Sequence, residues 1–479
     1  MENNSNGFIS VVATIFLLVF SLIPSTYAAQ TLTLNDVLLS ANSYYPDILA
    51  AQQELQQARA DRLYAQGAFD IELQQNTRAR TSGYYDGLSV AQKVIKPLRY
   101  SNAKLFAEYR ISDGQLPIYE DEFVTLDRGE FSMGVSLSLL RDGDIDKNRL
   151  ALINSDLNVD MEELRQETTI NNIGVQAAIA YLNWVNAHKQ LEVYQSLLKT
   201  AKYRHNAIQK RVILGSSAEI ELLDNEQNIL KRHSQVLNAE NELELTSIGL
   251  SMYWRDQQGH PKKPSAEIQP PKLNDLAADI RIDMNTLITD ALLQHPEIQQ
   301  IENALKQTEN TNRFHRNQLL PNLDIYAKVG QDIGAGSETR DGLDSFIGLQ
   351  FSMPLERRAA RGKLDKSTAK IKQLNYLKQG LVESLSGSLH QAHAKYINKR
   401  SQAEVSLRRA EITKQLEQQE EKRAEQGASN IFLLNVRQEN SAEAQVEAIT
   451  DQLKSILAGI ELLGRAYKVN ELYSGELAR

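Results

Sequence analysis

Few residues of this 479-residue chain have types and spacings that could do chemistry, and the most suggestive are acidic. Glu417 and Glu420 fall on the apolar seam of a long helical pattern, with Glu421 on a neighbouring face. Like charges crowded around a narrow aperture would repel anions, attract cations and raise one another's carboxylate pKa values. The alternative is that nearby cations such as Lys414 and Arg423 pair with these glutamates on a solvated face.

The sequence offers no constellation for catalysis. It has no cysteine, which excludes disulfides and thiolate chemistry, and no phosphate-binding loop of the Gly-x4-Gly-Lys-Ser/Thr type. His390 and His393 have the i, i+3 spacing of two metal ligands, but a solvated helix face explains them better because no third ligand stands near. The net charge of −8 gives no basic footprint for nucleic acid. We therefore expect no enzyme, metal or cofactor, and any transport would draw its energy from a partner.

The sequence contains an internal duplication. Residues 34–48 recur as 284–298, which places Pro46 and Pro296 about 250 residues apart. Each copy then runs in one order: helical stretch, strand-like alternation, very long helix, glycine turn and returning helix. A repeat of roughly 200–240 residues is too long for a solenoid unit, so it predicts a duplicated half-molecule.

The duplication and composition predict the division of the chain. A proline-containing linker separates the copies, since Pro261, Pro264, Pro270 and Pro271 fall between them. The predicted segments are a signal peptide at 1–28, a first repeat at 29–255, the linker at 256–282, a second repeat at 283–467 and a C-terminal tail at 468–479.

The N-terminus has the pattern of a cleaved secretory signal. An apolar run of about 16 residues, 8–23, is short for a membrane-spanning helix, which needs about 20. Small residues at Thr26 and Ala28 fit cleavage after Ala28, although no Lys or Arg precedes the run; a retained anchor is the alternative. No later apolar run is long enough to span a bilayer as a helix, so a membrane crossing would use strands.

Two very long helices dominate each half. Residues 144–214 and 357–426 contain no proline, and about 70 residues correspond to about 105 Å of helix. Such lengths indicate a coiled coil or the wall of a helical tube. A heptad seam with a second apolar set beside it predicts two neighbours per helix. The seam of the first copy comprises Ile170, Ile173, Ala177, Ala180, Trp184, Ala187, Leu191, Tyr194, Leu198, Ala201, His205, Ile208 and Val212.

Each long helix should reverse at a glycine. Gly215 and Gly427 follow the seams, and glycine is the usual residue where a helix ends in a left-handed conformation. Ser217 and Ser429 are then candidate N-caps of returning helices that continue to about Trp254 and Tyr467. The opening helices are expected at 34–68 and 284–320.

Strand-like alternation precedes each long helix. Runs of about ten residues, apolar on one face and polar on the other, are typical of transmembrane barrel strands, the alternative being a soluble sheet with one wet face. Two strands per copy make about four per chain, too few to close a barrel, so the chain should oligomerise. The predicted runs are 69–80, 131–139, 323–329 and 345–353, with an additional run at 104–111.

The copies differ by an insertion. About 35 extra residues lie within 81–128 of the first copy, because the offset between copies falls from about 250 to about 215 across this region. The sequence leaves open whether they form a surface loop or lengthen the strand pair.

On these features the chain resembles the TolC family of outer-membrane efflux and secretion channels. The resemblance spans essentially the whole mature chain, and its motifs, each weak alone, recur twice in one order. They are the Leu34-Asn35-Asp36-Val37 and Tyr45-Pro46-Asp47-Ile48 segments with their echo at 284–298, Leu320-Pro321-Asn322-Leu323, Ser352-Met353-Pro354-Leu355, and the glycine tips followed by Leu222-Leu223-Asp224 and Leu433-Leu434-Asn435. One departure is Leu139-Leu140, which stands where the second copy has Pro354-Leu355.

The resemblance implies a mainly α fold with transmembrane β-structure. Duplicated helix–strand–strand–helix halves from three chains would form a twelve-stranded barrel in the outer membrane on a long helical barrel through the periplasm. Its implied partners are two further copies of the chain, outer-membrane lipid, a periplasmic adaptor and an inner-membrane pump, which would set the cargo. The implied function is the passive exit duct of a tripartite efflux or type I secretion system; the alternative is a periplasmic coiled-coil adaptor or spacer.

The resemblance also assigns candidate sites. The helix-reversal tips are where an adaptor would engage, with Gly215 and Gly427 otherwise only relieving turn strain. The glutamates near the second tip would form a periplasmic gate, because each becomes a ring of three in a trimer. The predicted docking residues are Val212, Gly215, Ser216, Gly427 and Ser429, and the predicted gate residues are Glu417, Glu420 and Glu421.

Overall fold

The computed structural model describes residues 31–116, 123–276 and 284–468. The predicted signal peptide, all but the first residue of the predicted tail, and the end of the predicted linker lie outside these residues. Among the described helices, none is both long and apolar enough to cross a membrane.

The described residues form two compact units, and both copies contribute to each. A helical unit lies within Met1–Ser40, Ala177–Ala278 and Glu404–Leu453. A second unit, which carries the sheet, lies within Ala41–Gln176, Asp279–Ala403 and Lys454–Arg479.

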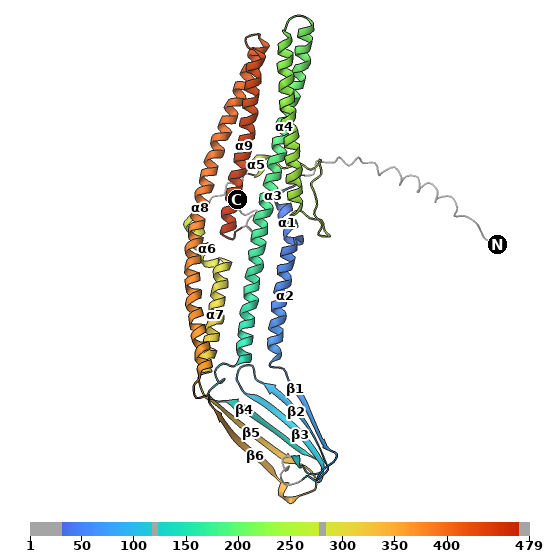
Figure 1. Cartoon of the computed structure of the whole chain (residues 1–479), viewed down its shortest axis with the longest axis vertical. Coiled ribbons are helices and arrows are strands. Elements are labelled where there is room, and N and C mark those ends of the chain that lie inside the picture. The colour runs from blue at the N-terminus through green and yellow to red at the C-terminus, as the bar shows by residue number, and fades with distance from the viewer. Residues whose placement is uncertain (1–30, 117–122, 277–283, 469–479) are drawn as a thin grey trace, which may run out of the picture. The chain divides into compact units, whose positions relative to one another are not determined.

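The sheet unit holds one antiparallel meander. The strands are paired in chain order, β1-β2-β3-β4-β5-β6, so β1 and β6 are its edges (Figure 1). Short connections join successive strands except β4 and β5, between which the chain runs through the helices α3 to α7. The strands are β1 (Glu72–Arg80), β2 (Gly87–Pro97), β3 (Lys104–Gly114), β4 (Glu130–Ser138), β5 (Asn322–Asp332) and β6 (Leu343–Ser352).

The mainly helical class with an antiparallel sheet is confirmed, but the strand count is corrected. The sheet has six strands instead of about four, because the insertion at 81–128 contributes the hairpin β2–β3 in the middle of the sheet. The inserted segment is therefore neither a surface loop nor an extension of an existing strand pair. The expected twelve-stranded barrel does not follow from six strands in each of three chains.

The long helices have the predicted extents. The helix α3 covers most of 144–214, and α8 covers most of 357–426. The helices of the described residues are α1 (Leu34–Tyr44), α2 (Pro46–Gly67), α3 (Lys147–Ile213), α4 (Glu219–Ser251), α5 (Leu273–Leu276), α6 (Met284–Gln294), α7 (Pro296–Asn317), α8 (Arg358–Glu425) and α9 (Ile431–Arg465).

Each opening helix is divided in two, where the sequence predicted one continuous helix. Tyr45 and His295 adopt extended backbone conformations, and the prolines that follow them begin α2 and α7. The physical reason is that proline disfavours the helical conformation of the preceding residue yet fits the first turn of a helix, where no amide donor is needed.

The sheet unit has a hydrophobic core where the helices α6, α7, α8 and α9 meet. Leu389 and Tyr396 of α8 pack there with Ile298 of α7 and Leu462 of α9, and all four side chains are buried. His295, at the start of α7, is buried nearby against Tyr467, with ring centroids 4.4 Å apart. The start of α7 thus packs against Tyr467, two residues after the end of α9.

Candidate functional site

One face of the sheet is apolar and exposed. Residues directly opposite one another share a face, and one row across all six strands reads Leu73, Val94, Ala107, Met133, Val329 and Ser345. Leu73 is 71% exposed and Ile347, on the same face, 75%. Soluble monomers rarely expose an apolar area of this kind, so this face is suited to an apolar environment.

The opposite face is polar, and its charges are paired across strands. Lys93 and Glu108 of the inserted hairpin form an ion pair of 3.5 Å. Glu130 on β4 accepts hydrogen bonds from Arg110 on β3 and, at 2.7 Å, from Lys328 on β5. The paired charges leave this face polar without a strong net field.

Aromatic stacking also links the inserted hairpin β2–β3 to the strand β5 of the second copy. Phe106 of β3 stacks on Tyr326 of β5, with centroids 5.3 Å apart and planes 8° from parallel. Between them lies Gly134 of β4, where a Cβ would overlap both the Phe106 ring and the Ala327 carbonyl. Glycine is therefore required for this close approach.

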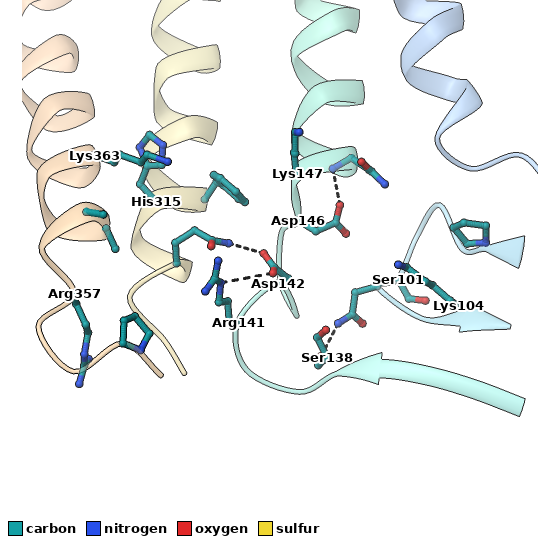
Figure 2. A pocket seen from close by; sticks show the side chains of 18 of the residues that line it. Ser101, Lys104, Ser138, Arg141, Asp142, Asp146, Lys147, His315, Arg357 and Lys363 are labelled. Carbon is teal, nitrogen blue, oxygen red and sulfur yellow. Dashed lines mark hydrogen bonds and ion pairs between the residues drawn. The ribbon is translucent and has the colours of Figure 1, made fainter. Parts of the chain in front are cut away.

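A cavity of about 1030 Å³, with both apolar and charged side chains in its lining, lies where the sheet meets α3, α7 and α8 (Figure 2). The turn between β2 and β3 lines it with Ser101 and Asn102, and Asn102 donates a hydrogen bond to the carbonyl of Ser138. Its cationic residues outnumber its acidic ones, Asp142, Asp146 and Glu356. The cationic lining residues are Lys104, Arg141, Lys147, Arg357, Arg358 and Lys363.

The cavity's charges are partly internally compensated. Asp142 accepts a hydrogen bond from Gln318, and the Asp146 carboxylate lies 2.7 Å from Nε of Arg149. Burial, helped by the charge of Lys363, lowers the pKa of His315. The lining therefore carries more positive than negative charge, which attracts anionic groups to the cavity.

The predicted docking residues lie in two equivalent helical turns. Gly215 and Gly427 have φ values of 70° and 74°. In the first turn the amide of Ser216 donates to Arg211 and that of Gly215 to Val212, and the second turn repeats this pattern. These are Schellman motifs, which satisfy the last carbonyls of α3 and α8.

The two tips expose different parts. Gly215 and Ser216 are exposed and Val212 is half-buried, whereas Ser429 is half-buried and donates its hydroxyl to Glu420. The N-cap predictions were wrong: Ala218 precedes α4 without a side-chain cap, and Asn430 caps α9 by accepting from the amide of Leu433 at 2.8 Å. Ser217 and Ser429 each lie one residue before the N-cap position of the returning helix.

The predicted gate glutamates all have cationic neighbours. Glu417 lies 2.9 Å from Lys414, and the Glu420 carboxylate, 5% exposed as a residue, lies 3.4 Å from Arg423. Glu421 is exposed. From α3, Arg204 faces Glu421 and Glu417, whose charges partly offset the fall in its pKa that burial causes. The ion pairs of the alternative are therefore present for Glu417 and Glu420, but Glu420 is buried and does not lie on a solvated face.

A buried polar layer, absent from the sequence predictions, joins the two helical hairpins. Arg232 of α4, only 1% exposed, donates to the carbonyl of Leu197 on α3 and to Gln438 on α9. Arg204 donates to Asn435, also on α9, at 2.7 Å. Burial lowers the pKa of Arg232 to about 10, with Arg204 adding to the effect. No sequence signal separated Arg232 from a solvated helix cation.

The described residues contain no group of three His, Asp or Glu side chains arranged to hold a metal ion. His390 instead contacts the carbonyl of Ser386 one turn earlier in α8, at 2.8 Å.

Comparisons with known proteins agree on the class. The family model described as "Outer membrane efflux protein" matches residues 125–254. The fold resembles the Neisseria gonorrhoeae MtrE outer membrane channel (TM-score 0.64, 14% identity, 91% of this chain and 88% of that chain). It also resembles the Campylobacter jejuni CmeC channel (0.60, 16%, 93% and 89%) and Vibrio cholerae VceC (0.61, 12%, 91% and 96%). No curated protein matches the chain.

The fold is therefore that of solved outer-membrane channels. The resemblance to the TolC family is confirmed by the efflux-protein model and by the folds of solved channels. The family model that matches residues 125–254 describes outer membrane efflux proteins, and the likeness to the solved channels is one of fold.

Proposed function

We propose that three copies of this chain form the exit duct of a tripartite efflux or type I secretion system. The observation that carries this proposal is the two-faced sheet: one face exposes apolar side chains such as Leu73 and Ile347, and the other pairs its charges across strands. An apolar outer face suits lipid and a polar inner face suits a water-filled pore. The open edges β1 and β6 require partners, because an unpaired strand edge cannot lie in lipid.

The proposal is tested by fractionating the cell membranes and by measuring the mass of the solubilised protein. The protein should be found in the outer membrane, and light scattering of the detergent-solubilised protein should give the mass of three chains. A monomeric species, or recovery only from the soluble periplasm, would instead favour the coiled-coil spacer.

The duct would be passive and would receive cargo from an inner-membrane pump through an adaptor bound at the helical tips. Because the chain has no cysteine, single cysteines can be placed cleanly at exposed Ser216 and Ala428. The matched control is Asp156, exposed on α3 in the sheet unit. A bifunctional reagent should capture the adaptor from the tip sites, and equal capture from Asp156 would contradict tip docking.

The gate would be formed by Glu417, Glu420 and Glu421 repeated three times. Replacing Glu417 and Glu420 with Gln should lower cation-over-anion permeability in planar bilayers, since removed carboxylates no longer attract cations. Arg423→Gln is the complementary variant, because it leaves the Glu420 carboxylate without its pair and should raise cation preference. Unchanged selectivity in both variants would remove the acidic-ring proposal and leave the channel assignment standing.

A further inference from the structure

The internal duplication provides a reference for the strand count. In the second copy the chain enters the sheet along β5, returns along β6 and enters α8. In the first copy it enters along β1 and leaves along β4 into α3, but makes the additional excursion β2–β3 between them. One copy therefore supplies two strands to the wall and the other supplies four.

The hairpin β2–β3 is part of the wall by its pairing. β2 pairs with β1 over residues 87–95, and β3 pairs with β4 over residues 104–110. Its exposed apolar side chains, Val94 and Leu105, continue the apolar face. A loop packed outside the sheet would not be hydrogen-bonded to a neighbouring strand on each side.

Two further contacts bind the hairpin to strands on its far side. Arg110 bridges to Glu130 of β4, which also binds Lys328 of β5. Phe106 reaches across β4 to stack on Tyr326 of β5. The polar face of the hairpin is thus integrated into the row of side chains that would line the pore.

We propose that the hairpin β2–β3 sets the width of the pore, so that three chains close an eighteen-stranded barrel that passes bulky polar solutes. This inference rests on the proposed function. Six strands preserve antiparallel closure, since β6 of one chain runs opposite to β1 of the next. Barrel diameter grows roughly linearly with strand number, so eighteen strands give about 1.5 times the diameter, and about twice the cross-section, of twelve.

The chemistry of the inner face favours selection by size over selection by charge. Its ion pairs join opposite charges on neighbouring strands, as in Lys93–Glu108 and Lys328–Glu130. A lumen lined in this way neither repels nor strongly retains anions or cations. The solutes it suits are polar molecules too large for a narrower barrel.

The decisive variant lacks residues 87–114. The loop after β1 is then joined to the loop before β4, and four strands remain. The deletion removes Lys93 together with its partner Glu108, and Glu130 keeps Lys328 although it loses Arg110. Cryo-electron microscopy of the purified trimers should show eighteen strands in the full chain and twelve in the deletion. With polyethylene glycols added only on the extracellular side of a planar bilayer, the deletion should exclude polymers of about 1.5-fold smaller diameter.

A pair of point variants keeps the proposal testable if the deletion does not assemble. Val94→Arg places a charge on the apolar face of β2, whereas Ala91→Arg places it on the polar face three residues away. We expect Val94→Arg to reduce the outer-membrane trimer at least about tenfold and Ala91→Arg to leave it nearly unchanged. As a control for lumen chemistry, Lys93→Gln with Glu108→Gln should leave polymer exclusion unaltered.

The outcomes separate this inference from the proposed function. A full-length trimer with twelve barrel strands, or equal tolerance of Arg at 94 and 91, would overturn the wide pore and leave the exit duct intact. A chain that forms no trimer and no conducting pore would overturn both.

Discussion

Phe106 and Tyr326 stack nearly parallel although their strands, β3 and β5, are separated by β4. The contact joins the insertion of the first copy to a strand of the second copy. It exists because Gly134 presents no side chain between the rings. The inserted hairpin therefore has a specific aromatic attachment in addition to its backbone pairing.

This stacking should be measurable as a coupling free energy. Phe106→Ala and Tyr326→Ala, singly and together, should give a double-mutant coupling of about 0.5–1.5 kcal/mol in the unfolding of the purified protein. Phe346 also touches Tyr326, with centroids 5.9 Å apart, and serves as a matched second cycle. Strictly additive effects for Phe106 and Tyr326 would show that the rings do not stabilise each other.

Gly134 should tolerate no larger residue. Gly134→Val forces the Phe106 ring and the Ala327 carbonyl apart, and overpacking of this kind costs about 1–3 kcal/mol. We expect the temperature at which the purified protein unfolds to fall. The double variant Gly134→Val with Phe106→Ala should recover part of the loss, and no recovery would place the strain elsewhere.

Replacing glycine with alanine should have opposite effects on stability at Gly427, which lies in a turn, and at Gly380, which lies inside a helix. Gly427→Ala should destabilise by about 1 kcal/mol, because a φ of 74° is unfavourable for any residue with a Cβ. Gly380 lies within α8, where a Cβ would meet nothing within 4 Å, so Gly380→Ala should stabilise by about 0.5–1 kcal/mol. Circular dichroism melts of the two variants provide the comparison.

Replacing the buried Arg232 should destabilise the fold far more than replacing its exposed neighbour Lys231. Arg232→Ala removes the donors to Leu197 and Gln438 and leaves buried acceptors unsatisfied, with an expected cost of about 2–4 kcal/mol. Lys231 pairs with Glu439 at 2.9 Å but its side chain is 56% exposed, so Lys231→Ala should cost less than about 1 kcal/mol. Limited proteolysis of α4 should be accelerated only in the first variant.

Acid should destabilise the chain through His295. Burial lowers its pKa to about 4, and a hydrogen bond to the backbone of Arg465 only partly offsets this. Because the folded pKa lies below the unfolded value of about 6.5, the unfolded state binds more protons, and stability falls as the pH drops from about 6.5 towards 4. Denaturant titrations at pH 7 and pH 4.5 should differ less in His295→Gln than in the parent chain.

The long helices and their glycine turns could be predicted because their signals are local. A proline-free heptad seam specifies α3 whatever it packs against, and Gly215 and Gly427 suit left-handed turns wherever they lie. The division at Pro46 was missed although it is also local, since the residue before a proline avoids helical conformation.

The strand β2 and the charge network could not be predicted in the same way. Ala91 and Ile95 fall on the polar face of β2 and blur its alternation, so pairing with β1 and β3 decides that it is a strand. The partners of Glu130 depend on a register between segments nearly 200 residues apart in sequence. The cavity with Lys104 and Lys363 likewise exists only after the turn of the hairpin meets α7 and α8.

The inserted hairpin also bears on how such a channel can change during evolution. A single added strand would reverse the direction of every later strand and send α3 to the wrong side of the sheet, whereas a hairpin restores both. In a threefold assembly the smallest permitted change is therefore six strands. If three chains close one barrel as proposed, its width would change in discrete steps, and a single inserted hairpin could widen the barrel without altering the helices.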